Sequence, residues 1–421
     1  MKTNQDKNIY IIGAGVSGLI AAQNLEQKGY APTILEATGN IGGRVRTEII
    51  DGWALDVGFQ VLLDAYPMSK KYLNYAALDL QILTPGARIY TKNNSYVIGD
   101  PLRDSSLLLP TLFSSVGSIL DKLKIFQLNL RLKHLPIATL FNGKETTTLA
   151  YLQHLGFSDK IINQFFKPFF SGIFLERELH TSSRMFEFIY KMFAEGFATL
   201  PKAGIGAIAT QLAGELKTTQ IQLNNEVRKL TTDFITMASG DQYPYDMCIV
   251  ATDPSSFLEG YPVKHRWKAC DTLYFSVPDT ETPPPIIHLS AFPDTLINNI
   301  FYPTSVQDSP DPHHQLLSVT IVRKHSFSSE VLVIQVIGEL EKYFSIKKAK
   351  FIKHYTLAAA LPDLRSVSYE PNLELLAYAD KILLCGDHTA NGSLNAAMLS
   401  GERAAEHALN YLELTEFKNL E

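Results

Sequence analysis

Cysteine is scarce in this chain, and its few copies are poorly placed for cross-linking or metal binding. The 421 residues include three cysteines, Cys248, Cys270 and Cys385, with no C-x-x-C pair. An odd number at such wide spacing implies neither a disulfide framework nor a zinc site. Cys248 and Cys385 lie in apolar runs, so we expect reduced cysteines in the core.

A hydrophobic run long enough to cross a bilayer is missing as well. Ser105–Leu120 is uncharged, but it has only 16 residues and contains Pro110, whereas a membrane helix needs about 20 apolar residues. Met1–Lys7 is polar and has no apolar signal core. We therefore expect an unexported, cytoplasmic protein.

Positive charge is not in excess, because 38 lysines and arginines stand against 43 aspartates and glutamates, for a net charge of −5. This balance disfavours nucleic acid as a partner. With 46% hydrophobic and 19% charged residues, the composition is typical of an ordered globular protein. The length exceeds one typical core and predicts two domains.

The segment Asn8–Gly18 carries the most informative pattern. It reads as a short buried strand that leads into Gly13-x-Gly15-x-x-Gly18 and then a helix. Gly13 permits the tight turn, Gly15 lets the backbone approach a pyrophosphate, and Gly18 lets the helix pack against the strand. Ser17 lies in the same turn, and the helix N-terminus offers N–H groups to an anion.

A second strand, Pro32–Leu35, ends at Glu36, 23 residues after Gly13. A carboxylate at this position accepts hydrogen bonds from the hydroxyls of a ribose. Strand, glycines, helix, strand and acid in this order predict a dinucleotide site.

A further glycine motif, Gly42-Gly43-Arg44, begins six residues after Glu36. Two glycines allow close approach, and a guanidinium is a forked donor, so this motif suits a diphosphate that is also contacted from a second side. Arg44 and Arg46 have the alternative of being surface cations, which we favour for Arg46 alone. Further along, Gly58, Phe59 and Gln60 are either candidate contacts to the dinucleotide or plain core and loop residues.

The pattern GAGVSGL…LEA…GGRVRT in Gly13–Thr47 resembles the N-terminus of the flavin-containing amine oxidase superfamily. That superfamily includes monoamine and polyamine oxidases, protoporphyrinogen oxidase and the carotenoid desaturases. The C-terminal part is similar to it too, with a strand at Lys381–Leu384, then Gly386-Asp387, and a Ser-Gly-x-x-Ala-Ala helix around Gly401. The resemblance implies FAD as the cofactor.

Several roles follow from this resemblance. Gly386 and Asp387 would contact the ribityl chain, although Asp387 has the alternative of capping the next helix. The backbone at Leu394 and Asn395, at a helix N-terminus, would face the flavin pyrimidine ring and stabilise negative charge there. The backbone of Val227 would contact the adenine.

The resemblance also implies an α/β fold, in which a Rossmann-like FAD-binding domain of the GR2 type is interleaved with an α+β substrate-binding domain. From the flavin motifs we expect residues 1–64, 202–256 and 372–421 to form the discontinuous FAD-binding domain. Residues 65–201 and 257–371 would form the substrate-binding domain.

Two segments of the expected substrate domain are unusual. Asn163–Phe174 is rich in phenylalanine and resembles a segment of desaturases and protoporphyrinogen oxidases. It is either core or the wall of an apolar tunnel, with Phe169 and Phe170 as candidate wall residues. Asp121–Leu135 mixes leucines with lysines and arginines and fits a helix or a strand. We favour a cap over the cavity for it, with peripheral membrane contact as the alternative.

No acid–base pair is evident, and the catalytic residues remain unassigned. Amine oxidases of the superfamily place a lysine near flavin N5 at the start of a strand. Alignment with Thr272–Phe275 puts Cys270 at that position and Lys268 two residues earlier. His388 is a candidate proton carrier, but a histidine in a turn is the simpler interpretation.

The absent lysine favours an FAD-dependent enzyme that removes two electrons from a C–H bond of an apolar small molecule, as desaturases and protoporphyrinogen oxidase do. Flavin N5 would pass the electrons to oxygen or a quinone. The alternatives are an amine oxidase and, more remotely, a non-catalytic protein like the GDP-dissociation inhibitors. Monoamine oxidases attach the flavin through a cysteine that Ile352–Leu384 lacks, so we expect FAD without a covalent link.

Overall fold

Three distant parts of the chain contribute strands to one six-stranded sheet. The computed structural model describes residues 7–58, 60–92, 94–262, 265–278, 283–372 and 376–418, with the backbone alone for 415–418. The strand order is β10-β2-β1-β14-β21-β20, and every pair is parallel except β20 with β21. The strands are β1 (Ile9–Ile12), β2 (Thr33–Leu35), β10 (Gln220–Gln222), β14 (Met247–Val250), β20 (Ala377–Ala379) and β21 (Ile382–Leu384).

Alternate residues of these strands point to opposite faces of the sheet, and a different layer of structure covers each face. Ile11, Ile249 and Leu383 pack in the cluster that contains the helices α1 (Val16–Glu26) and α13 (Leu394–Lys418). Their neighbours pack against a three-stranded antiparallel sheet made of β11 (Val227–Leu230), β12 (Phe234–Met237) and β13 (Gln242–Pro244). Because both faces are covered, the strands read as continuous hydrophobic runs instead of alternating ones.

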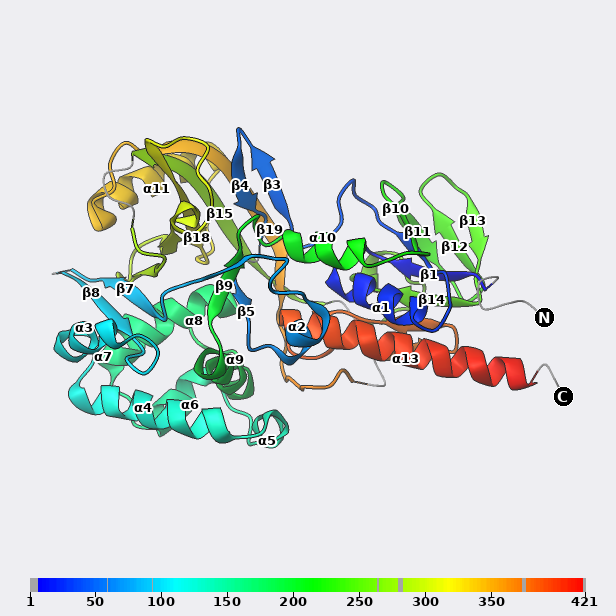
Figure 1. Ribbon diagram of the computed structural model, residues 1–421, viewed down its shortest axis with the longest axis horizontal. Coiled ribbons are helices and arrows are strands. Elements are labelled where there is room, and N and C mark those ends of the chain that lie inside the picture. Colours follow the sequence, from blue (N-terminus) through cyan, green and yellow to red (C-terminus); the bar gives the residue numbers. More distant parts are fainter. Residues whose placement is uncertain are drawn as a thin grey trace.

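Helices α1 and α13 lie side by side (Figure 1) and touch backbone to backbone. A Cβ at Gly401 of α13 would clash with the carbonyl of Ser17 in α1. Gly18 likewise has no room for a Cβ, because the carbonyl of Gly13 and the side chain of Ala251 lie against it. Gly18 therefore has the packing role that the sequence predicted for it.

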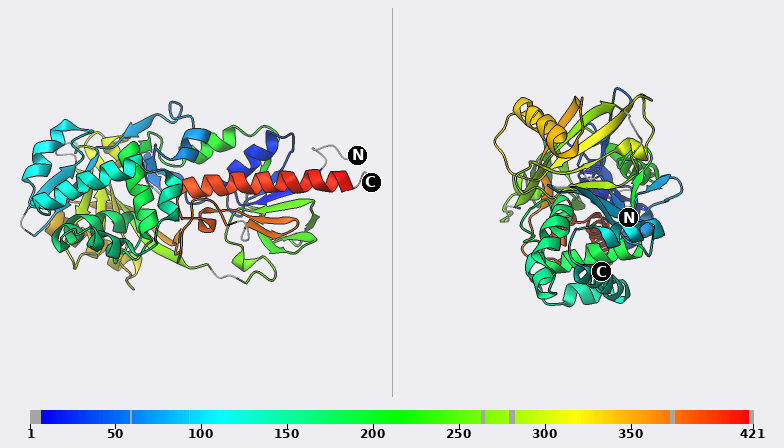
Figure 2. Two further views of the ribbon diagram at one scale, coloured as in Figure 1. Left: turned by 90° about the horizontal axis from the view of Figure 1, so that it is seen from below. Right: turned by 90° about the vertical axis from the view of Figure 1, so that its left-hand side faces the viewer.

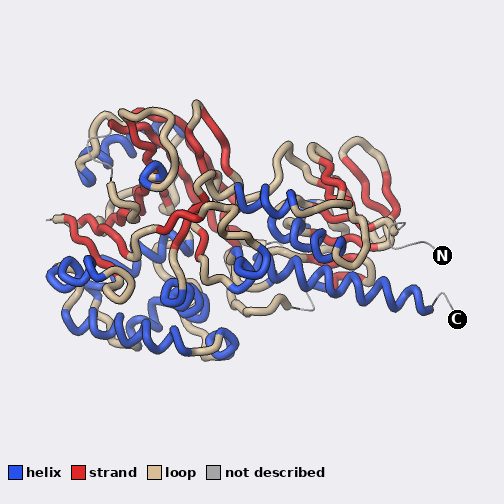
Figure 3. The backbone as a smooth tube through the Cα atoms, in the orientation of Figure 1, coloured by secondary structure: helices blue, strands red, loops and turns tan. Residues whose placement is uncertain are grey.

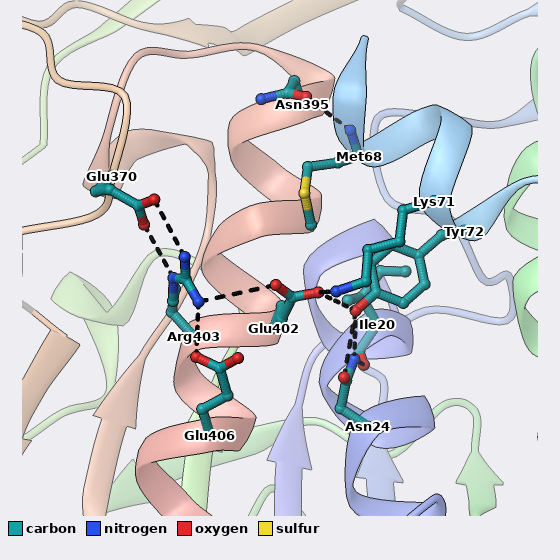
Figure 4. Close-up of polar contacts among 10 residues, drawn as sticks. All are labelled: Ile20, Asn24, Met68, Lys71, Tyr72, Glu370, Asn395, Glu402, Arg403 and Glu406. Carbon is teal, nitrogen blue, oxygen red and sulfur yellow. Dashed lines mark hydrogen bonds and ion pairs between the residues drawn. The ribbon is translucent and has the colours of Figure 1, made fainter. Parts of the chain in front are cut away.

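A buried carboxylate ties these two helices to a third one. Figure 4 shows Glu402 of α13 as the acceptor for Lys71 and Tyr72 of α2 (Pro67–Tyr72), while the Tyr72 hydroxyl also contacts Asn24 of α1. The side chain of Glu402 is 7% exposed. These hydrogen bonds and the lysine charge outweigh the effect of burial and lower the pKa of Glu402, so it stays ionised.

A second, seven-stranded sheet supplies the other large surface. Its order is β19-β15-β18-β17-β16-β7-β8, antiparallel except for β16 with β7. Leu273 and Phe275 of β15 face helix α11 (Ser329–Phe344), so one face is closed by that helix. The strands are β7 (Gly86–Tyr90), β8 (Ser95–Gly99), β15 (Trp267–Pro278), β16 (Ile287–Ser290), β17 (Ile297–Phe301), β18 (His314–Ile321) and β19 (Lys350–Pro362).

The remaining helices gather beside this sheet, at the end of the molecule away from both termini (Figures 2 and 3). They are α3 (Leu108–Phe113), α4 (Ile119–His134), α5 (Ile137–Asn142), α6 (Thr148–His154), α7 (Asp159–Ile161), α8 (Lys167–Phe174) and α9 (Ser183–Glu195); α10 (Ala207–Gly214) lies beside α1. Short strands complete the fold: β3 (Thr47–Ile50) with β4 (Trp53–Asp56), and β9 (Ala198–Pro201) between β5 (Leu62–Leu63) and β6 (Leu80–Ile82).

Asp121–Leu135, which the sequence left open between helix and strand, lies almost wholly in helix α4. The helix begins at Ile119 because Ser118 and Asp121 form a reciprocal capping box. Four hydrogen bonds from Ser118 and Ser158, one of which belongs to this capping box, hold the Asp121 carboxylate and lower its pKa to about 2 despite burial. In the described part of the chain, no helix combines the length and the apolar character needed to cross a bilayer.

The close contact of α1 with α13 predicts that Gly401→Ala destabilises the protein. The added methyl group meets backbone, which cannot rotate away, and overpacking of this kind costs about 1–3 kcal/mol. Gly338→Ala is the matched control, since Gly338 lies within α11 with open space at its Cβ position. Chemical denaturation should show a loss for Gly401→Ala and an unchanged or higher stability for Gly338→Ala. Equal effects of the two substitutions would contradict the prediction.

Candidate functional site

A cavity of about 840 Å³ brings together residues from both ends of the chain. It runs from the two glycine motifs, past the open face of the seven-stranded sheet, to helices α3 and α4. Fourteen of the predicted site residues line it: Gly13, Gly15, Ser17, Glu36, Gly42, Gly43, Arg44, Gly58, Gln60, Phe169, Phe170, Gly386, Asp387 and Leu394.

Other predicted residues are not part of this lining. For Val227 and Asn395 the predicted contacts are made by the backbone and stay predictions. Val227 begins β11 and packs in the core under the three-stranded sheet, so its side chain does not line the cavity. Asn395 is fully buried in the first turn of α13, and its Oδ1 accepts a hydrogen bond of 3.0 Å from the Met68 N–H (Figure 4). Phe59 falls outside the described residues.

The glycine motifs leave open space next to the N-terminus of α1. Gly13 has φ +106° and donates its N–H to the Leu35 carbonyl at 2.8 Å, which fixes the turn. No atom lies within 4 Å of the place where a Cβ of Gly15 would stand, and Gly43 faces the Gly15 backbone. Because a helix N-terminus attracts anions, this uncluttered end of the cavity fits the diphosphate of FAD.

Glu36 has a structural task that the sequence did not reveal. Its Oε2 accepts the Ala14 N–H at 2.8 Å, and its Oε1 accepts the backbone N–H and the hydroxyl of Thr38 at 2.9 and 2.8 Å. The carboxylate therefore holds the glycine turn in place and also borders the cavity.

Arg44 and Asp387 meet across the cavity although 343 positions separate them. Their two hydrogen bonds are parallel, 2.9 Å from Nη1 to Oδ2 and 2.6 Å from Nη2 to Oδ1. Burial alone would lower the pKa of Arg44, but the Asp387 carboxylate more than offsets it and raises that pKa. The guanidinium also stacks over Trp267, 5.2 Å from the ring centroid. The pair links the Gly-Gly-Arg and Gly-Asp motifs.

His388 occupies the short turn after Gly386, yet it is buried and lines the cavity. Its ring contacts those of His265 and Trp267, and its Nε2 has no hydrogen-bond partner among the described residues. Burial lowers the pKa of His388 to about 4, so the ring is neutral at pH 7. Trp267 in turn donates its indole N–H to Asp253 at 2.9 Å. Trp267 and His265 had no recognisable motif in the sequence.

At the start of β15, Cys270 and Lys268 differ in their position relative to the cavity. Cys270 lines the cavity, and burial raises the pKa of its thiol to about 12. A bulge separates it from Lys268 in the pairing with β19. Lys268 does not line the cavity, and its Nζ donates to the Thr181 hydroxyl at 2.8 Å. Among the described lining residues the only lysine is Lys122, near the surface on α4.

An aromatic wall surrounds the middle of the cavity. Phe169 stacks on Phe165 and contacts Phe193, while Phe170 packs against Phe186 in the core. Tyr190 and Phe193 line the same space from α9. The sequence analysis missed these two, although their spacing of three residues on an amphipathic helix puts both on one face.

Comparison with known proteins places the chain in a family. A family model described as flavin containing amine oxidoreductase matches residues 16–409. The chain belongs to the flavin-containing amine oxidoreductase family. It is therefore an FAD-dependent oxidoreductase, which confirms the predicted family and favours catalysis over the non-catalytic alternative.

Curated relatives match only part of this oxidoreductase. The L-amino-acid oxidase of Echis ocellatus is 33% identical over 112 residues, which is 25% of this chain and 22% of that protein. The enzyme of Daboia russelii is 34% identical over 112 residues, with the same shares. The match thus spans less than a quarter of each relative.

Solved structures resemble the oxidoreductase along nearly its whole length. A candidate protoporphyrinogen oxidase from Exiguobacterium sp. 255-15 has a TM-score of 0.73 at 18% identity, over 97% of this chain and 99% of that one. Putrescine oxidase bound to putrescine has a TM-score of 0.67 at 14% sequence identity, over 96% of this chain and 99% of that one. Reduced UDP-galactopyranose mutase has a TM-score of 0.66 at 14% sequence identity, over 96% of both chains. These likenesses confirm the predicted α/β fold.

The buried state of His388 predicts a pH dependence of stability. The folded protein binds this proton near pH 4 and the unfolded chain near 6.5, so stability falls as the pH is lowered between these values. His388→Gln should reduce the slope of unfolding free energy by up to about 1.4 kcal/mol per pH unit. Burial also lowers the pKa of His288 to about 4, so His288 still contributes to the slope in this variant.

Urea denaturation of the protein at several pH values measures this slope. The exposed His154 gives the control variant His154→Gln, which should leave the slope unchanged. An identical slope for wild type and His388→Gln would show that His388 is protonated in the folded protein.

Proposed function

We propose that this enzyme binds FAD without a covalent bond and uses it to remove two electrons from a C–H bond of an apolar small molecule. Molecular oxygen or a quinone is the proposed final acceptor. The observation that carries the proposal is the continuity of one cavity, with nucleotide-binding motifs at one end and an aromatic wall in the middle.

The cofactor contacts follow from the residues that line the first part of the cavity. The turn at Gly13 and Gly15 would bind the diphosphate at the N-terminus of α1, with Arg44 on its other side. Glu36 would accept hydrogen bonds from the adenosine ribose. Asp387 would contact the ribityl chain. The hydrogen bonds from Gly13 to Leu35 and from Ala14 to Glu36 fix the turn, and a fixed turn reduces the entropy cost of binding.

When bound, FAD supplies the redox chemistry, since N5 of its ring accepts a hydride equivalent from a substrate carbon. The residues of the chain would position the substrate and exclude water from the cavity. The N-terminus of α13 begins at Leu394, on the cavity wall, and its dipole favours negative charge on the ring. The phenylalanines on α8 would hold an apolar substrate and exclude water.

Amine oxidation is the second candidate, because the family match and the partial likeness to L-amino-acid oxidases favour it. A cationic amine would need a carboxylate or an aromatic cage. Two described carboxylates line the cavity without a proposed cofactor contact, and both are engaged within the chain: Asp100 with Asn129 and Arg103, and Asp253 with Trp267. Together with the position of Lys268, this supports the apolar substrate.

FAD binding is tested by release and by mutation. Acid precipitation should release all the flavin as FAD, because no covalent bond is expected; flavin retained in the pellet would refute this. Glu36→Ala should raise the dissociation constant of FAD roughly 10- to 150-fold, since a hydrogen bond to a charged group contributes about 1.5–3 kcal/mol.

Thr38→Val is the control for Glu36→Ala, because it removes one contact of the carboxylate but leaves the carboxylate itself. Flavin fluorescence titration of the apoprotein gives both constants. An unchanged affinity in Glu36→Ala would contradict the ribose contact and would also show that FAD binding does not need this carboxylate to hold the turn.

The substrate class is tested by anaerobic flavin reduction with a panel of carotenoids, porphyrinogens and amines. Phe169→Asp should slow reduction by an apolar substrate at least tenfold, since it puts an unpaired charge on the cavity wall. Phe234→Asp, at an exposed position on β12, should have no effect. Rapid reduction by simple amines that is insensitive to Phe169→Asp would favour the amine oxidase, with Lys268 as the first residue to test.

A further inference from the structure

Exposed apolar residues are concentrated on one short segment. Ten of the 19 strongly exposed large hydrophobic residues in the described chain lie between Leu102 and Leu130. Phe113 is 78% exposed and Leu120 is 69% exposed. Scattered exposed leucines are normal for a protein surface, whereas a gathering of this kind marks an interaction site.

The α3–α4 platform, as we call this surface, consists chiefly of Leu109, Phe113, Ile119, Leu120, Leu123 and Phe126. It forms the end of the molecule opposite to the termini (Figure 1). Helix α3 has an apolar sequence, yet it has no buried residue.

Helix α4 has two apolar faces. Leu128 and Leu132 are buried in the core, and Ile119, Leu123 and Phe126 form an exposed stripe at helical spacing. Ile119, Leu123 and Phe126 also line the cavity, yet they are 65%, 54% and 45% exposed, so no described residue covers this outer face completely.

The charge around the platform is positive, although the whole chain carries −5. Residues 100–135 contain five lysines and arginines and three aspartates; Arg103 is paired with Asp100, and Asp121 is buried in the capping box. Arg131 is paired with Glu187, whereas Lys122 and Lys124 donate to backbone carbonyls, which do not cancel their charges.

The platform is also the mouth of the cavity. Leu112, Ile119, Leu123 and Phe126 are strongly exposed and at the same time line the cavity that reaches the glycine motifs. A second copy of the chain or another protein seated here would close the mouth. A bilayer would keep it open toward an apolar phase.

We propose that the α3–α4 platform docks on a bilayer that contains anionic lipid, so that an apolar substrate passes from the lipid into the cavity through the mouth on α4. Leucine and phenylalanine side chains of the platform enter the boundary of the acyl chains, and Lys122 and Lys133, which lie next to the exposed stripe of α4 at helical spacing, face the headgroups. Docking is independent of the substrate, whereas passage of the substrate rests on the proposed function.

Vesicle co-sedimentation of the FAD-loaded protein tests the docking. The protein should bind vesicles of phosphatidylcholine with phosphatidylglycerol more tightly than phosphatidylcholine alone, and added salt should weaken this binding. Phe113→Asp with Leu120→Asp should lower the partition coefficient at least about tenfold. Neither residue lines the cavity, so the flavin spectrum should not change.

Leu414→Asp is the matched control, because Leu414 is 63% exposed on α13 at the opposite end of the molecule. It should bind vesicles like the wild type. Should the double variant fold poorly, Phe113→Trp offers a second measurement, since its fluorescence should shift to the blue when mixed vesicles are added.

Three results would overturn the proposal: wild type that stays in the supernatant, a double variant that binds vesicles as well as wild type, and an unshifted Phe113→Trp spectrum. Light scattering that finds a dimer dissociated by the double variant would assign the platform to a second copy instead. None of these measurements involves substrate oxidation, so failure of docking is distinguishable from failure of the proposed function.

Discussion

The backbone contact between α1 and α13 is the constraint on which the site depends. Gly401 rests against Ser17 because neither side chain nor Cβ stands between the helices. This contact aligns two helices whose N-termini border the same cavity, one at the glycine turn and one at Leu394. The buried Glu402 then adds α2 to the pair. The positive ends of two helix dipoles thus border one space.

Local patterns predicted the parts of the site that local chemistry determines. The strand, turn and acid between Ile9 and Glu36 follow from glycine geometry and hydrophobic runs, and the structure forms them within a few residues of the expected positions. The Gly-Gly-Arg and Gly-Asp motifs were recognisable for the same reason. The domain boundaries at 64, 202, 256 and 372 stay a prediction.

Contacts between distant segments were not predictable from one sequence. That Arg44 would pair with Asp387 depends on how β21 lies in the sheet, and that Trp267 would stack on Arg44 depends on the start of β15. The bulge that turns Lys268 away from the cavity has no sequence signature. The two apolar faces of α4 were not predictable either, because a pattern of leucines at helical spacing does not show which face packs against the core.

The topology of the six-stranded sheet has a consequence for the order of events during synthesis. The first strand pairs with β2, which follows it directly in the chain, but its other partner β14 comes from the middle of the chain, and β14 in turn pairs with β21 from the last part. Until β21 leaves the ribosome, β14 presents an apolar edge that invites wrong pairing. The nucleotide-binding half is therefore completed last, although its motif is made first. A chain cut before Ile382 would leave that edge of β14 permanently exposed.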